Sequence, residues 1–141
     1  PPPGLAQLDA LVAGTVTAGL PVTLCVEGAP RPLERGLDLA AYRVVQEGLT
    51  NALKHAPGAS TRVLVRYRPD ELQIDVLDQG MAAGERQSGG ERQGGGDVTE
   101  DSRRGLLGLR ERIAPYRGTF TAGRAAGGGY RIRARFPLEP T

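Results

Sequence analysis

The chain has 141 residues, 39% of them hydrophobic and 24% charged, with a net charge of +2. This length favours one domain with one core. The single cysteine excludes a disulfide framework, and the absence of a basic block with interleaved aromatics disfavours nucleic-acid binding. No apolar run reaches the roughly 18 residues of a membrane helix, so no direct membrane contact is expected.

The first elements are a short helix and a strand. Leucines and a valine from Leu5 to Val12 give a helical pattern that is expected to end at Gly14. Residues 22–26 then alternate as a strand does, and Cys25 within this run is expected to be a buried, inert thiol. Asp38 is a plausible N-cap for the helix that follows, and Pro57-Gly58 marks the end of that helix.

This central helix, RVVQEGLTNALKHA at residues 43–56, carries two different faces. One face is apolar and suited to packing on a sheet: Ala41, Val44, Val45, Gly48, Leu49 and Ala52. The other is polar and contains the only lysine and the only histidine of the chain: Arg43, Glu47, Asn51, Lys54 and His55. Asparagine is a mediocre helix former. Its place in the middle of this helix therefore suggests that the polar face holds a ligand and does not merely face solvent.

The remainder predicts a mixed α/β layer. Residues 62–67 and 72–77 alternate on either side of a turn and predict a hairpin, with Asp78-Gln79-Gly80 at its end. Residues 82–104 are polar and glycine-rich, which by composition alone is a disordered linker. A helix from 105 to 116 with Gly105 and Gly108 in its first turn, and two strands near 119–122 and 130–136 joined by glycines, complete the chain. We therefore expect a sheet with helices on one face.

Three features could combine into a nucleotide site. An Asp at a strand end can accept a hydrogen bond from an exocyclic amine, and a glycine-containing helix start can bind phosphate through its N–H groups. The Asn51 oxygen beside a carboxylate can hold Mg²⁺. Each feature also has an ordinary interpretation: a turn for Asp-x-Gly, tight packing for Gly105-x-x-Gly108, and a C-terminal helix cap for His55.

In this order and spacing the motifs resemble those of the ATP-binding catalytic domain of sensor histidine kinases, within the gyrase B, Hsp90, histidine kinase and MutL superfamily. The resemblance covers roughly residues 5–137, and it is greatest with the branch whose response regulators carry helix-turn-helix domains. Residues 43–56 are similar to the N box, and 78–80 to the first glycine box. Residues 105–113, GLLGLRERI, are similar to the second glycine box, and 128–137 to the final strand.

The resemblance implies a two-layer α/β sandwich of the Bergerat type, with a mixed, mostly antiparallel sheet. It implies that residues 1–19 are a helical segment and linker from an upstream dimerisation region, that 20–138 are the catalytic domain, and that about 82–104 form a mobile ATP lid. The implied metal ligands for Mg²⁺ are Asn51 and Glu47, which are also the implied catalytic pair. The implied ATP-binding residues are Asn51, Lys54, His55, Asp78, Gly80, Met81, Arg104, Gly105, Leu106, Leu107 and Gly108, with the N–H groups from Arg104 to Leu107 around the phosphates.

The implied reaction transfers the γ-phosphoryl group of ATP to a histidine of the kinase's own dimerisation domain, and then to a response regulator. His55 lies in the N box, so the acceptor histidine is expected outside these 141 residues, in a parent kinase that is anchored to the membrane with this domain in the cytoplasm. Two positions depart from the family pattern, which usually has a glycine where Ala82 stands and a pair such as Gly-His where Arg103 and Arg104 stand. Two alternatives stay open: a stand-alone serine kinase and binding protein of the anti-sigma type, and a degenerate module that no longer binds ATP.

Overall fold

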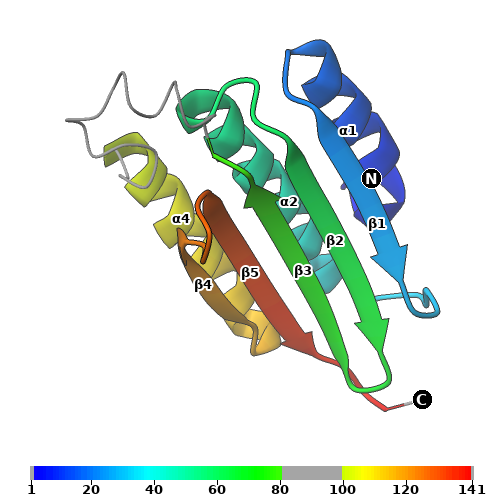
Figure 1. Ribbon diagram of the computed structural model, residues 1–141. Helices are drawn as coiled ribbons and strands as arrows, with labels where there is room; N and C mark the ends of the chain where they lie inside the picture. Colours follow the sequence, from blue (N-terminus) through cyan, green and yellow to red (C-terminus); the bar gives the residue numbers. More distant parts are fainter. Residues whose placement is uncertain (1, 81–99, 141) are drawn as a thin grey trace.

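The computed structural model describes residues 2–80 and 100–140. Its strands form one sheet in the order β1-β2-β3-β5-β4, in which β1 and β2 are parallel and the other neighbours antiparallel. The helices lie together on one face of this sheet (Figure 1). The predicted two-layer sandwich is therefore confirmed. The strands are β1 (Val22–Glu27), β2 (Thr61–Arg68), β3 (Glu71–Asp78), β4 (Thr119–Arg124) and β5 (Tyr130–Pro137), and the helices are η1 (Leu5–Gln7), α1 (Leu8–Thr17), α2 (Arg35–His55), α4 (Glu100–Ile113) and η3 (Ala114–Tyr116).

The hairpin β2–β3 forms the centre of the sheet and has the predicted alternation. Val63 pairs with Val76, and Val65 with Ile74, and these side chains are buried in the core. On the other face Asp75 is also buried, because Arg133 of β5 donates two hydrogen bonds to its carboxylate, at 2.9 and 2.8 Å. An ion pair between neighbouring strands thus covers part of the face that no helix covers.

The apolar face of α2 packs on this sheet as predicted. Its residues Ala41, Val44, Val45, Gly48, Leu49 and Ala52 are all buried. Gly48 is the point of closest approach, because a Cβ atom built there would lie 2.8 Å from the Cβ of Val76. The absence of a side chain at position 48 therefore sets how closely α2 approaches β3.

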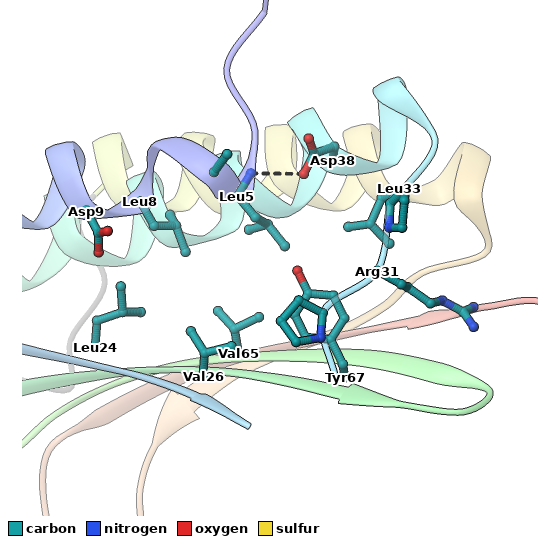
Figure 2. A pocket seen from close by; sticks show the side chains of 13 residues that line it. Leu5, Leu8, Asp9, Leu24, Val26, Arg31, Leu33, Asp38, Val65 and Tyr67 are labelled. Atoms are coloured by element: carbon teal, nitrogen blue, oxygen red, sulfur yellow. Dashed lines mark hydrogen bonds between the residues drawn. The ribbon is translucent and has the colours of Figure 1, made fainter. Parts of the chain in front are cut away.

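Asp38 does not cap α2, and this prediction is wrong. The helix begins at Arg35 and its N-cap position is Glu34. The Asp38 carboxylate accepts a hydrogen bond from the N–H of Leu5 at 2.9 Å instead, which caps the first turn of the N-terminal segment. Figure 2 shows this bond beside a hollow lined by side chains of η1, α1, β1 and β2.

Two further predictions in the N-terminal part are corrected. Helix α1 continues through Gly14 to Thr17, since one glycine costs a helix only about 1 kcal/mol. Cys25 is exposed, because it points away from the helices on an edge strand whose outer face is uncovered. Leu8 is buried in the same core as α2, so the N-terminal helix shares that core. The origin of residues 1–19 in an upstream region stays a prediction.

The helix predicted from Gly105 begins earlier. Helix α4 starts at Glu100 and ends at Ile113, where η3 continues to Tyr116. The residues before Gly105 are polar but compatible with a helix, and the acidic Glu100 and Asp101 suit the positive end of the helix dipole. The predicted lid at 82–104 therefore overlaps α4 at its last five positions, and positions 82–99 lie outside the described residues. Within residues 2–80 and 100–140, no helix has the length and apolar content to cross a membrane.

The contact of Gly48 with Val76 predicts a cost for any side chain at position 48. We expect Gly48→Ala to lower the free energy of unfolding by about 1–3 kcal/mol, the range of overpacked core sites, in urea denaturation followed by circular dichroism. Gly14→Ala is the matched control, because a Cβ atom there meets nothing within 4 Å. It should raise stability by up to about 1 kcal/mol through helix propensity. Equal effects of the two substitutions would contradict the packing argument.

Candidate functional site

The predicted site residues gather at one end of the domain. Strand β3 ends there at Asp78, α2 ends there at His55, and α4 begins there at Glu100 (Figure 1). The polar residues buried at this end include Asn51, Asp78 and Ser102. A buried polar group is costly unless it is hydrogen-bonded, so the partners of these residues define the site.

Asn51 and His55 meet the same hydroxyl group. Ser102 Oγ donates to Asn51 Oδ1 at 3.3 Å and lies 2.6 Å from His55 Nε2. A serine hydroxyl can donate one hydrogen bond and accept others, so Ser102 joins the amide of Asn51 and the imidazole of His55 into one polar group.

Lys54 forms an ion pair on the outer side of this group. Its Nζ donates to Asp101 Oδ2 at 2.5 Å, and Arg104 Nη2 lies 3.9 Å from the other oxygen of the same carboxylate. The hydrogen bond and charge of Asp101 raise the pKa of Lys54, and Lys54 lowers the pKa of Asp101. One carboxylate thus faces two cations, both from the predicted ATP-binding set.

Asp78 is a buried carboxylate, with 8% of its surface exposed. Burial raises its pKa, against the opposing effects of backbone hydrogen bonds at Gly80 and Tyr130 and of the nearby His55. The Gly80 N–H donates to its Oδ1 at 2.9 Å, and Gly80 has a φ of +76°, which favours glycine. A carboxylate has two oxygens and several lone pairs, so Asp78 can accept a further hydrogen bond from an amine beside these backbone contacts.

Glu47 lies one turn before Asn51 on α2 and faces α4. A Cβ atom at Gly105 would lie 2.2 Å from a carboxylate oxygen of Glu47. Gly105 therefore allows α4 to pass close to α2 with the Glu47 side chain between them.

The N–H groups of the predicted phosphate cradle are used inside helix α4 in this conformation. Because α4 begins at Glu100, the N–H groups from Arg104 to Leu107 lie inside the helix, where each bonds the carbonyl four residues earlier. Leu106 packs partly against the core and Leu107 is exposed. Gly108 also lies inside α4. Met81 lies outside the described residues.

Asp101 and Ser102 make polar contacts with α2 but are not among the predicted site residues. They lie in the polar, glycine-rich stretch, where the composition gives no sign of single functional residues. The signal that could have found them is the acidic pair before Ser102, since Asp and Glu are favoured in the first turn of a helix.

Comparisons with known proteins show the family of this chain. The family model "Histidine kinase-, DNA gyrase B-, and HSP90-like ATPase" matches residues 36–140. The sensor histidine kinase LiaS of Bacillus subtilis is 24% identical over 77% of this chain and 27% of its own length. The nitrate/nitrite sensor protein NarX of Escherichia coli is 24% identical over 87% of this chain and 19% of its own. The chain thus spans about a quarter or less of these relatives.

Solved structures share the fold. The mycobacterial sensor histidine kinase MprB matches with a TM-score of 0.61 and 18% identity, over 95% of this chain and 97% of that one. Full-length ShkA, solved in complex with AMPPNP, matches with a TM-score of 0.64 and 17% identity, over 97% of this chain and 30% of that one. The chain belongs to the family of histidine kinase-, DNA gyrase B- and HSP90-like ATPases, as an ATP-binding catalytic domain of the histidine kinase type.

Proposed function

We propose that this domain binds ATP with Mg²⁺ and supplies the γ-phosphoryl group in a two-component sensor histidine kinase. The observation that carries the proposal is that Asn51, Lys54 and His55 lie on one side of α2 and that His55 is near enough to the buried carboxylate of Asp78 to lower its pKa. The carboxylate of Asp78 suits the adenine amine, and the amide oxygen of Asn51 suits a metal ion. The cationic Lys54 suits phosphate. The family match supports the same assignment.

The adenine is assigned to Asp78. The Gly80 N–H engages Oδ1, and the same carboxylate is the proposed acceptor for the exocyclic amine of the base. The positive φ of Gly80 and its missing side chain let the base lie close to the backbone. Met81 completes this part of the proposed set.

The residues present fit Mg²⁺ held mainly by the nucleotide. Among residues 2–80 and 100–140, no group of three or more His, Cys, Asp or Glu could hold a metal ion. Mg²⁺ often takes only one or two protein oxygens and keeps water and phosphate for the rest. Asn51 Oδ1 and the Glu47 carboxylate are the proposed ligands, and the metal would neutralise phosphate charge.

Lys54, His55 and Arg104 are the proposed phosphate contacts. Contacts from the N–H groups of residues 104–107, and from Gly105 to Gly108, would require the first turns of α4 to unwind, because those groups are used inside the helix. In-line phosphoryl transfer depends mostly on positioning and on charge neutralisation. These residues would therefore orient the nucleotide, and Glu47 would polarise the attacking group.

The proposed acceptor is a histidine of the dimerisation domain in a longer, membrane-anchored kinase, which then passes the phosphoryl group to a response regulator. Its catalytic domain would work in the cytoplasm, where ATP is. His55 is not the proposed acceptor, because its Nε2 is engaged with Ser102 beside Asn51. A phosphate-binding position on α2 is compatible with that contact, whereas an acceptor must approach the γ-phosphoryl group from outside.

Asp78→Asn tests the adenine site. We expect the affinity for ATP·Mg²⁺ in isothermal titration calorimetry to fall about ten- to hundredfold, because a hydrogen bond to a charged group contributes about 1.5–3 kcal/mol. The variant should still fold, since an amide oxygen can accept from the Gly80 N–H. Unchanged affinity would contradict the assignment, and no binding of ATP·Mg²⁺ by the unaltered chain would contradict the proposed function.

The raised pKa of Asp78 predicts how the stability of Asp78→Asn, relative to the unaltered chain, depends on pH. Burial raises the pKa of Asp78 in the folded state, so between the unfolded and folded pKa values the folded chain holds more protons and loses stability as pH rises. Asparagine does not ionise. Asp78→Asn should therefore be more stable than the unaltered chain at pH 7 in urea denaturation, and this difference should vanish below the ordinary carboxyl pKa of about 3.9. A difference in stability that is the same at every pH would instead be caused by a change in packing at position 78.

Asn51→Ala tests the metal site. Its affinity for ATP should fall about tenfold or more in the presence of Mg²⁺ but change little in EDTA, because the lost group is a metal ligand. Gln46→Ala is the matched control, since Gln46 is an amide on the same helix whose oxygen accepts from Arg43. Equal losses with and without Mg²⁺ would show that Asn51 acts on ATP directly.

The assignment of His55 predicts the outcome of a labelling experiment. Incubation of the chain with γ-³²P-ATP and Mg²⁺ should give no acid-labile phosphate on the protein, because its only histidine is not the acceptor. A dimerisation domain from a matched kinase, added in trans, serves as the positive control for label transfer. Phosphohistidine on the chain alone, abolished by His55→Gln, would overturn the assignment.

A further inference from the structure

We propose that Asp101 is an internal competitor of the ATP phosphates, whose carboxylate occupies the cations of the site when nucleotide is absent. This inference rests on the proposed function. Lys54 Nζ donates to Asp101 Oδ2 at 2.5 Å, and Arg104 lies 3.9 Å from Oδ1. The two oxygens of one carboxylate thus face the two cations that the proposed function gives to the triphosphate.

Asp101 and the ATP phosphates compete because both are anions that need the same cation. Lys54 is the only lysine of the chain, and an ammonium group that holds a carboxylate must exchange it for phosphate. If Asp101 stays in place when ATP enters, its negative charge lies beside a triphosphate of the same sign. Both effects weaken binding until the first turn of α4 withdraws from α2.

Ser102 connects the same turn to the remaining polar groups. Its hydroxyl donates to Asn51 Oδ1 and lies 2.6 Å from His55 Nε2, and it is buried with 3% of its surface exposed. The oxygen that it occupies is the proposed Mg²⁺ ligand. One helical turn therefore engages Lys54, His55 and Asn51 together, and nucleotide entry would affect all three contacts at once.

The ion pair between Lys54 and Asp101 predicts a raised lysine pKa that can be measured in the absence of nucleotide. Because Lys54 is the only lysine, ¹³Cε-lysine labelling gives one lysine signal in a two-dimensional NMR spectrum. In the unaltered chain the pKa of this amine should lie above the ordinary value of about 10.4, and Asp101→Asn should bring it down toward that value. An identical pKa in the two proteins would show that Asp101 does not hold Lys54 and would overturn the proposal.

The competition itself is tested by affinity for ATP·Mg²⁺ in calorimetry. Asp101→Asn should bind about two- to fivefold more tightly, the range that an exposed ion pair can account for. Glu100→Gln is the matched control, because it removes the same charge from the adjacent exposed position in the same turn. In a Lys54→Met background, Asp101→Asn should gain less, since the cation that Asp101 occupies is gone.

The outcomes separate this inference from the proposed function. If the unaltered chain binds ATP·Mg²⁺ and Asp101→Asn binds equally or less tightly, the competition is overturned and the nucleotide site stands. If Asp101→Asn and Glu100→Gln both bind more tightly by the same factor, general charge is the cause and the specific competition is overturned. If no variant binds ATP·Mg²⁺, the proposed function fails and the competition fails with it.

Discussion

The contact between Gly48 and Val76 fixes the position of α2, and the site depends on that position. No side chain fits at residue 48, so helix and strand meet there with a fixed rotation of the helix. At about 100° per residue, this rotation puts Glu47, Asn51 and Lys54 along the flank of α2 beside its buried face. The same contact lies two residues before Asp78 on β3, so one packing constraint sets both sides of the site.

The buried polar groups at this end depend on one another. Asn51, Asp78 and Ser102 are all more than nine-tenths buried, and each would be costly without a partner. Asp78 receives the Gly80 N–H, and Asn51 receives the Ser102 hydroxyl. Helix α4 therefore contributes to α2 not only packing but also the hydrogen bond that a buried amide needs.

The regular parts of the fold could be predicted from the sequence because they follow local patterns. Alternation placed both strands of the central hairpin, and each residue that helical spacing assigned to the apolar face of α2 is buried. The polar face was found for the same reason, since Glu47, Asn51 and Lys54 recur at helical intervals. The end of β3 at Asp78 followed from the hairpin.

The errors arose where a distant contact decided the outcome. Asp38 has the composition of an N-cap, but its partner is the N–H of Leu5, 33 positions away. Cys25 lies in an apolar run, yet the edge position of β1 exposes it. The start of α4 was missed because the partners of Asp101 and Ser102 lie on α2, and local composition cannot show such contacts.

Helix α4 is held differently at its two ends. Leu109 and Ile113, toward its C-terminus, are buried in the core, whereas Ser102 is the only buried residue of its first five. Gly105 and Gly108 between them each cost about 1 kcal/mol of helix stability relative to alanine. Hydrophobic anchoring thus ends before the site begins, and the turn beside Asn51 and Lys54 is held there mainly by polar contacts. Phosphate and metal can replace polar contacts of this kind, so the start of α4 can respond to a nucleotide while its C-terminal half stays packed on the sheet.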